Sequence, residues 1–567
     1  MGSGSTSSSS WNQGRGTANR RSWLSQCWLN ARRKKPLNSP HNLLISRGDN
    51  VNGLSRRLNL FELLLLGIGG SIGAGIFVVT GTVAHDAGPG VAISFMLAGL
   101  ASILIAMCYA ELASRFPAVV GGAYLYAYSA FNELTAFLVF GQLMLDYHIS
   151  AASVARSLAG YVISLLELFP SLRGHIPEWL GHGQEFLGGA VSINILAPIL
   201  LALITINLSI GVKESSSVNS MMTITKVVIV IVVIFMGSFE VDVENWSPFV
   251  PNGYKAVFTG ATVVFFSYVG FDAVANCAEE SERPQRDLPV GIIGSLLVCI
   301  VLYIGVSLVI TGMIPFKLIG DEAPLAEAFT SMGLKYVSVL ICVGAVVGLF
   351  TTLLVGLYVQ SRLYLGLGRD GLIPSFFAEV HPACHTPINS QVWVGAVACT
   401  LSAFFNVKVL SYILSVGSLA GYSVAAACVV NLRWTGNTAH SRREGSLLLL
   451  AIAVCGFGGG LCFRYSASFA YLIVIGVITV GAIAALHFRQ EYESPPGFSC
   501  PWVPSLPAAS IFLNLFMFAQ LHYEAWARFL GVTVVLVGVY AFYGQHNAKS
   551  EAEEPIIYYK APSVGNS

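Results

Sequence analysis

The sequence predicts an all-α polytopic membrane protein in which the first and the sixth transmembrane helix are each broken near the middle. Only 11% of the 567 residues are charged and the mean hydropathy is +0.68, whereas about a quarter of the residues of a soluble domain are charged. Apolar runs of about 20 residues, long enough to cross a bilayer, recur along the chain. Two of these runs are interrupted by glycine or polar residues near their centres.

Residues 1–57 form a polar tail that holds ten Lys and Arg residues. The tail has no apolar core followed by a small-residue cleavage site, so we expect no cleaved signal peptide. The first membrane span is then expected to direct the chain to the membrane. We predict that the tail is cytosolic, basic and without a fold of its own.

Fourteen apolar runs follow, and we predict a transmembrane helix near each of them: 60–83, 91–113, 134–160, 192–210, 218–239, 254–279, 288–313, 334–360, 391–406, 409–432, 446–463, 468–488, 505–522 and 527–544. The third span could begin earlier, near Gly122, and the ninth and tenth are separated by a short break. Cytoplasmic loops concentrate Lys and Arg. With a cytosolic N-terminus, 22 of these residues lie inside, eight lie outside and Lys226 lies within a span. This bias predicts that both ends are cytosolic.

The first broken span, Leu60–Thr80, has four glycines at its centre: Gly69, Gly70, Gly73 and Gly75. Each costs roughly 1 kcal/mol relative to alanine in a helix interior, so the middle unwinds more easily than the apolar ends. Unwinding frees backbone N–H and C=O groups at membrane depth. Such a break is tolerated only where it is buried in protein or lines a polar cavity.

The second broken span, Thr262–Asn276, is interrupted by Ser267, Gly270 and Asp272. It lies five spans after the first. Two interrupted helices in corresponding positions indicate an inverted repeat of five plus five helices with the substrate site between them. We therefore expect a ten-helix core over residues 58–432, four additional helices over 433–545 and a cytosolic tail over 546–567.

The two breaks offer complementary backbone groups. In the first span the outer half-helix starts near Ala74 to Ile76, where free N–H groups and the positive end of the helix dipole suit a carboxylate. In the sixth span the first half-helix ends near Phe266 to Val269, where free carbonyls suit an ammonium group. Together they would hold the zwitterionic backbone of an α-amino acid. The alternative is that the glycines serve only close helix packing.

Two charged residues lie inside spans. Asp146, near the middle of the third span, should face the bundle interior or a wet cavity. It would favour a cationic substrate side chain, or it is a structural hydrogen-bonding carboxyl group or one that burial holds neutral. Lys226 lies about two turns into the fifth span. It is a fixed counter-charge, a group that exchanges protons because burial weakens its hold on them, or a side chain that reaches the cytosolic interface.

Other chemistry is not indicated. The eleven cysteines show no CxxC or Cys/His spacing, so we expect no metal and no redox motif and assign them to apolar packing. The sequence has no phosphate-binding loop and no arrangement of a nucleophile with a base. We therefore expect no enzyme, no cofactor and no nucleic-acid partner.

The chain resembles the cationic amino acid transporter family of the amino acid, polyamine and organocation superfamily, most closely its plant members. The resemblance covers roughly residues 55 to 545. It rests on five motifs: Gly69-Gly-Ser-Ile-Gly-Ala-Gly-Ile-Phe, Cys108-Tyr-Ala-Glu-Leu-Ala-Ser-Arg-Phe-Pro, Gly122-Ala-Tyr-Leu-Tyr-Ala-Tyr, Ser153-Val-Ala-Arg, and Phe265-Phe-Ser-Tyr-Val-Gly-Phe-Asp-Ala-Val with Pro284-Gln-Arg-Asp-Leu-Pro.

The resemblance implies site residues. The substrate carboxylate would meet backbone amides at Ser71, Gly73, Ala74 and Gly75, and the amino group would meet the carbonyls of Phe266, Ser267 and Val269. Lys226 matches a lysine that in bacterial relatives replaces the sodium ion of sodium-coupled transporters and is implicated in proton coupling. Asp146 matches an acidic residue of those relatives.

The sequence therefore predicts a proton-coupled symporter of cationic amino acids such as arginine and lysine, with neutral amino acids left open. Its partners would be the substrate, protons and the lipid bilayer, and the oligomeric state is not indicated. By resemblance we favour the vacuolar membrane over the plasma membrane. Two alternatives use the same fold: an amino acid receptor that signals through its tails, and a polyamine carrier that needs no carboxylate site.

Overall fold

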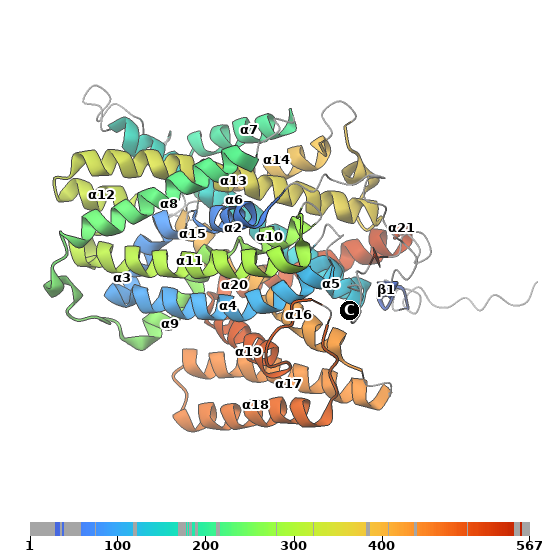
Figure 1. The fold of residues 1–567 in the computed structure, drawn as a ribbon. Coiled ribbons are helices and arrows are strands. Elements are labelled where there is room, and N and C mark those ends of the chain that lie inside the picture. Colours follow the sequence, from blue (N-terminus) through green and yellow to red (C-terminus); the bar gives the residue numbers. More distant parts are fainter. Residues whose placement is uncertain are drawn as a thin grey trace, which may run out of the picture.

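The computed structural model describes the following residues: 29–34, 37–38, 58–73, 75–116, 122–167, 177, 180, 184–186, 191–210, 216–278, 281–320, 323–381, 386–405, 407–435, 439–495, 497–548 and 556–557. Within them the chain is almost entirely helical, and most long helices run side by side along one direction (Figure 1). Strands occur there only in two short pairs, β1 (Leu37–Asn38) with β4 (Ile556–Ile557) and β2 (Gln184–Phe186) with β3 (Val191–Ile193). The predicted all-α class is confirmed.

The helices follow one another along the chain as α2 Leu60–Ser71, a π-helical turn Gly75–Val79, α3 Thr80–Ala87, α4 Val91–Arg115, α5 Ala123–Ala130, α6 Glu133–Glu167, α7 Leu196–Ser209, α8 Ser216–Ser238, α9 Gly253–Val264, a 3₁₀ turn Phe265–Tyr268, α10 Phe271–Asn276, α11 Pro284–Met313, α12 Pro324–Ser331, α13 Lys335–Arg369, α14 Ile388–Phe404, α15 Val407–Ile413, α16 Val416–Arg433, α17 Ala439–Arg464, α18 Phe469–Arg489, α19 Ser505–Gln520, α20 Tyr523–Val539, a π-helical turn Tyr540–Gly544 and α21 Gln545–Asn547.

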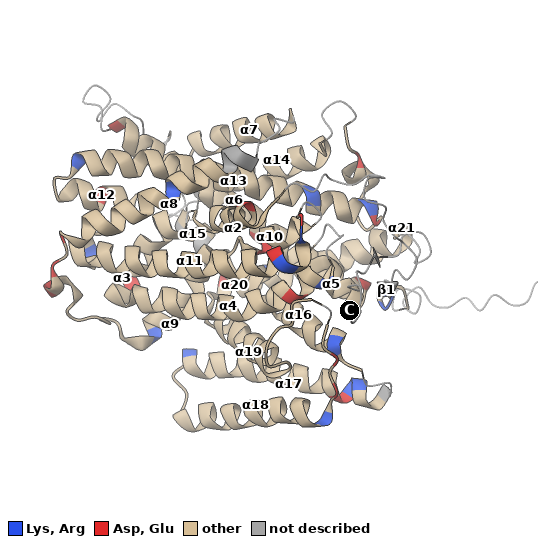
Figure 2. Ribbon diagram, viewed as in Figure 1, with Lys and Arg blue, Asp and Glu red and all other residues tan. Residues whose placement is uncertain are grey.

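Ten helical stretches of the described residues are long and apolar enough to cross a membrane, and four shorter apolar helices, α2, α7, α14 and α19, accompany them. Each of the fourteen predicted ranges overlaps one of these helices. The third span does not extend back to Gly122, because α5 is a separate helix that ends at Ala130 before α6 begins. In Figure 2 the charged residues gather toward the helix ends and leave a middle band that is nearly free of them. Both features are typical of a multi-pass membrane protein.

The first broken helix lies at the centre of the molecule. α2 packs against α8, α10, α11 and α13, which enclose it (Figure 1). Its start is fixed by a capping box: the Asn59 side chain accepts from the Glu62 amide at 3.0 Å, and the Glu62 carboxylate accepts from the Asn59 amide at 3.0 Å. Helices α17, α18 and α19 form a separate layer, in which α17 packs on α18 and α19, and α19 packs on α4 and α16.

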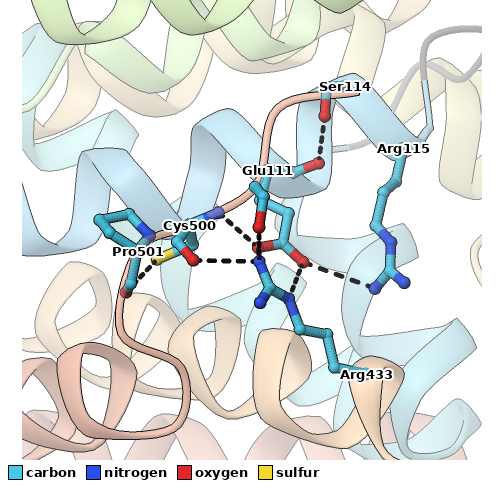
Figure 3. A network of polar contacts seen from close by, with 7 residues as sticks. Glu111, Ser114, Arg115, Arg433, Cys500 and Pro501 are labelled. Atoms are coloured by element: carbon cyan, nitrogen blue, oxygen red, sulfur yellow. Dashed lines mark hydrogen bonds and ion pairs between the residues drawn. The ribbon is translucent and has the colours of Figure 1, made fainter. Parts of the chain in front are cut away.

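A buried ion network joins this outer layer to the core (Figure 3). The Arg433 guanidinium of α16 donates to both oxygens of Glu111 in α4, at 2.9 and 2.6 Å, and also to Ser499 Oγ and the Cys500 carbonyl. The Cys500 amide donates to Glu111 at 2.9 Å, and Arg115 lies 3.6 Å from the same carboxylate. The network therefore ties α4, α16 and the segment before α19 into one unit.

We expect Arg433→Met to lower the melting temperature of the purified protein by several degrees. Removing one partner leaves Glu111 buried without its main counter-charge, which typically costs about 3–5 kcal/mol. Thermal unfolding in detergent measures the effect. Arg443→Met is the matched control, because Arg443 lies exposed on α17. The double variant Glu111→Gln with Arg433→Met should recover part of the loss, and an unchanged melting temperature for Arg433→Met would show that the network adds no stability.

Candidate functional site

The first break lies between α2 and the π-helical turn at Gly75–Val79. α2 ends at Ser71, and Ile72 adopts an extended conformation with ψ of 91°. The predicted break is confirmed as a structural feature. Ser71, Gly73 and Gly75 lie in or beside it, and Ala74 falls outside the described residues.

Lys226 of α8 caps the broken end of α2. Its ammonium group is fully buried and donates to the carbonyls of Gly69 and Ile72 at 2.5 and 3.1 Å. The Thr352 hydroxyl of α13 lies 3.2 and 3.1 Å from the same two oxygens. A cation at the C-terminal end of a helix is favoured by the helix dipole. Lys226 is thus a counter-charge for backbone groups that the break leaves unpaired, and its side chain does not extend to the membrane interface.

The second break separates the 3₁₀ turn Phe265–Tyr268 from α10. Val269 is extended and Gly270 has a φ of +143°, a conformation that residues with a Cβ rarely adopt. A Cβ on Gly270 would lie 2.6 Å from the carbonyl carbon of Gly70, and a Cβ on Gly75 would overlap the side chain of Ser267. The two breaks therefore touch each other, and glycine permits the contact.

Tyr303 of α11 bridges the two breaks. Its hydroxyl oxygen lies 2.7 Å from the Ser71 carbonyl and 2.9 Å from the Ser267 carbonyl, so a single proton serves both acceptors. The side chain is fully buried. The broken ends of both helices are consequently held together from α11 as well as by their own contact.

A cavity opens beside this contact and encloses about 560 Å³ of empty space, part of it open to solvent. It lies between the two breaks, α6 and α13, and its lining includes Gly70, Tyr147, Ser150, Ala151, Val154, Val269, Gly270, Asp272, Ala273, Thr352, Leu353, Val355, Gly356, Val359 and Gln360. Of the predicted site residues only Val269 lines it. Ser71, Gly73, Gly75, Phe266 and Ser267 lie in the adjoining breaks, behind the first layer of the wall.

Asp146 does not line this cavity. Its carboxylate accepts from Arg528 of α20 at 2.6 Å and from the amide and hydroxyl of Ser418 at 2.6 and 3.0 Å. Because Ser418 lies in the first turn of α16, Asp146 caps that helix from α6. This geometry favours the structural reading of Asp146 over contact with a substrate.

The cavity wall contains polar residues that the sequence did not identify as site residues, among them Tyr147, Gln360 and Asp272. The Tyr147 hydroxyl donates to the Asp272 carboxylate, and the Gly270 amide donates to the other Asp272 oxygen at 3.1 Å. Neighbouring residues of a helix point about 100° apart. Asp146 therefore faces α16 and α20, whereas Tyr147 faces the cavity. The polar interruption at Asp272 was the one signal in the sequence that could have identified this wall.

Two broken membrane helices that meet beside a partly closed cavity define a membrane transport protein of the permease type. Comparison with known proteins agrees. Residues 58–463 match the amino acid permease family model, and residues 498–548 match the model of its C-terminus.

Three relatives extend the match. The chain is 61% identical over 96% of both chains to the Arabidopsis thaliana protein named cationic amino acid transporter 9, chloroplastic. It is 41% identical to the methylthioribose transporter of Bacillus subtilis, over 81% of this chain and 98% of the relative. It is 34% identical to the branched-chain amino acid permease of Bacillus subtilis, over 89% of this chain and 97% of the relative. The chain belongs to the amino acid permease family, as a member of the plant cationic amino acid transporters.

The preference for the vacuolar membrane is wrong. It was drawn from the resemblance alone, and the relative with 61% identity carries a chloroplastic name. The motifs behind the resemblance lie in the membrane spans, which are built alike whichever membrane they cross, so they hold no information about the compartment.

Gly270→Ala should destabilise the protein, because the methyl group would strain the backbone at positive φ and press on Gly70. Strain of this kind costs about 1–3 kcal/mol before the overlap is counted. Gly476→Ala in α18 is the control: a Cβ there has no neighbour within 4 Å, so the change should be neutral or stabilise the helix by up to about 1 kcal/mol. In detergent the melting temperature of Gly270→Ala should fall, whereas that of Gly476→Ala should stay the same or rise, and equal shifts would contradict the close contact of the breaks.

Proposed function

We propose that the protein transports amino acids across a membrane by alternating access, with cationic amino acids such as arginine and lysine as its main substrates, neutral ones in addition, and protons as the coupling ion. The observation that carries the proposal is the contact of the two breaks beside the cavity, through Gly70 with Gly270 and Gly75 with Ser267. The names of the relatives support the amino acid class.

The backbone of the substrate would bind at the breaks. The half-helix that begins at Gly75 directs its first amides toward the break, so the carboxylate would be held at Ser71, Gly73, Ala74 and Gly75. The α-ammonium group would bind carbonyls of the 3₁₀ turn, at Phe266, Ser267 and Val269. Exposure of Gly70 and Val269 to the cavity supports this site, and Tyr303 would give up its shared contacts with Ser71 and Ser267 as the substrate enters.

Lys226 would couple the movement to protons. In its charged form it fixes the end of α2 through charge-assisted hydrogen bonds to Gly69 and Ile72. Loss of the proton would remove that charge and weaken the cap. The first half of the broken helix would then be freer to move against α8 and α13, which is the movement that alternating access requires.

A second, smaller cavity supports a path through the protein toward α5. It is lined by Tyr109, Tyr124 and Asn276 among others, and it shares Tyr147 and Asp272 with the main cavity. Tyr147 and Asp272, which are hydrogen-bonded to each other, line both cavities. At the smaller cavity, the Tyr124 hydroxyl donates to Asp370 at 2.7 Å. We propose that these two contacts open in turn when substrate leaves on the side of α5.

The membrane topology is part of the proposal. We propose fourteen crossings: an inverted repeat of five plus five helices over residues 58–432, four further helices over 433–545, and tails 1–57 and 546–567 on the same side. The four shorter apolar helices α2, α7, α14 and α19, added to the ten longer ones, support this count.

We also propose that the protein resides in a chloroplast membrane. The name of the relative with 61% identity supports this location. So does the composition of residues 1–57, which include eleven Ser, ten Lys or Arg and a single acidic residue, Asp49. Organellar transit peptides are rich in serine and arginine and poor in acidic residues.

Uptake into proteoliposomes tests the proposed transport. We expect the wild type to accumulate radiolabelled arginine and lysine when an inward proton gradient is applied. One proton per substrate permits up to about tenfold accumulation per pH unit. Lys226→Met should abolish the response to the gradient, because methionine fills the space without a charge or a titratable proton. Leucine and glutamine are measured in parallel to define the neutral range.

Lys255→Met is the control for the loss of one positive charge, since Lys255 is exposed at the start of α9. It should transport like the wild type. If uptake is independent of the proton gradient in both the wild type and Lys226→Met, then Lys226 has a structural role and the protein is a facilitator. Substrate binding without any accumulation would instead identify a receptor, and transport that persists when the substrate carboxyl group is blocked would favour a polyamine carrier.

The location is tested with the full chain carrying a C-terminal fluorescent protein in plant cells. We expect the signal to coincide with a chloroplast membrane marker. Deleting residues 2–28 should abolish this targeting. The deletion leaves Ala31 and Arg33 in place because both contact the fold: Ala31 is buried, and the Arg33 carbonyl accepts from the Glu133 amide at 2.9 Å. Signal at the plasma membrane from the full chain would overturn the proposed location.

A further inference from the structure

Asp272 is a buried carboxyl group in the wall of the main cavity. Two comparable acids in the helices are neutralised by arginine: Glu111 by Arg433 and Asp146 by Arg528. Asp272 is only 4% exposed, yet among the described residues no Lys or Arg forms an ion pair with it. Its hydrogen-bond donors include the Tyr147 hydroxyl and the Gly270 amide. Burying a carboxylate with no counter-charge is costly, so a cation that entered the cavity beside Asp272 would lower that cost.

Gln360 of α13 places a second acceptor in the same cavity. Its amide nitrogen donates to the Tyr147 carbonyl at 3.2 Å, which directs the other end of the side chain away from that bond. The Gln360 Oε1 atom is buried and has no hydrogen-bond partner among the described residues. Buried acceptors are nearly always paired. Asp272 and Gln360 therefore lie in the same cavity wall, and both can accept a further hydrogen bond. Both side chains are also hydrogen-bonded to Tyr147.

The rest of the wall suits an uncharged stem. Ala151, Val154, Val355, Gly356 and Val359 are small or aliphatic, and none of the cavity's lining residues carries a positive charge. A chain of methylene groups can pack there while its polar end reaches Asp272. By contrast, the positive charge of Lys226 is bound to the carbonyls of α2 and does not line the cavity.

We propose that Asp272 and Gln360 bind the side-chain cation of a basic amino acid, either the guanidinium of arginine or the ammonium of lysine. The inference rests on the proposed function and specifies which residues of the protein recognise the side chain of the substrate. The guanidinium or ammonium supplies the charge that Asp272 lacks, and one of its N–H groups donates to Gln360 Oε1. Charge-assisted hydrogen bonds of this kind are about twice as strong as neutral ones.

Arginine and citrulline form the matched ligand pair, because they have nearly the same shape and only arginine carries a side-chain charge. Binding is measured as stabilisation of the purified protein against heat at increasing ligand concentration, and transport as uptake into proteoliposomes. The variants are Asp272→Asn and Gln360→Leu. Asp86→Asn is the control, since Asp86 is an exposed acid outside the cavity.

We expect the wild type to bind arginine roughly 10- to 100-fold more tightly than citrulline. Asp272→Asn should reduce this ratio to about one by weakening arginine alone, Gln360→Leu should reduce it in part, and Asp86→Asn should leave it unchanged. A wild type that does not distinguish the two ligands overturns the inference without any variant. Equal loss of both ligands in Asp272→Asn also overturns it, because the carboxyl group would then bind a group common to both.

Failure of the proposed function gives a different result. If the wild type binds arginine over citrulline through Asp272 but accumulates neither, the cation site stands and transport is refuted. If uptake of amino acids is found but is indifferent to the side-chain charge in wild type and Asp272→Asn, transport stands and the cation site is refuted.

Discussion

Backbone groups released by a helix break have no water to bind in the middle of a membrane, and this constraint governs the centre of the molecule. The carbonyls of Gly69 and Ile72 are paired by Lys226 and Thr352. The same solution recurs elsewhere. Asp146 pairs with the amide of Ser418 at the start of α16, and the Arg156 guanidinium donates to the carbonyls of Ser402 and Ala403 at the end of α14. Each of these buried charges completes a helix end that belongs to another part of the chain.

This pairing joins the two breaks mechanically. The end of α2 is held from α8 and α13, its Gly70 contacts Gly270, and Tyr303 of α11 reaches carbonyls on both sides. A change in one break must therefore disturb the other. Lys226 caps the end of α2 and does not line the cavity. A change at Lys226 would therefore reach the contact of the breaks through α2, which is the physical basis for proposing a coupling role rather than a recognition role.

The sequence was sufficient for the helical class, the positions of the apolar helices and both breaks, because hydropathy and glycine clusters are local properties. It could not determine which charged residue faces the cavity. Asp146 and Tyr147 are adjacent, and the rotation of α6, set by packing against α16 and α20, decides between them. The partners of Asp146 and Lys226 lie hundreds of residues away or in another helix, so no pattern in the sequence reveals that their charges are already paired. The compartment was also beyond reach, because the spans that carried the resemblance say nothing of the membrane that holds them.

Buried acidic residues of the same type can have different roles, and their counter-charges distinguish these roles. Asp146, Glu111 and Asp272 are all buried acids in membrane helices, and each would be a candidate for contact with a cationic substrate. Two of them have arginine partners within the protein, so an incoming cation would have to displace an existing ion pair. Asp272 lies in the cavity wall beside the Gln360 amide oxygen, which has no hydrogen-bond partner among the described residues. Of these three acids, Asp272 is the one that forms no ion pair with an arginine of the described residues, so at this position a cationic substrate would supply a new interaction instead of replacing an old one.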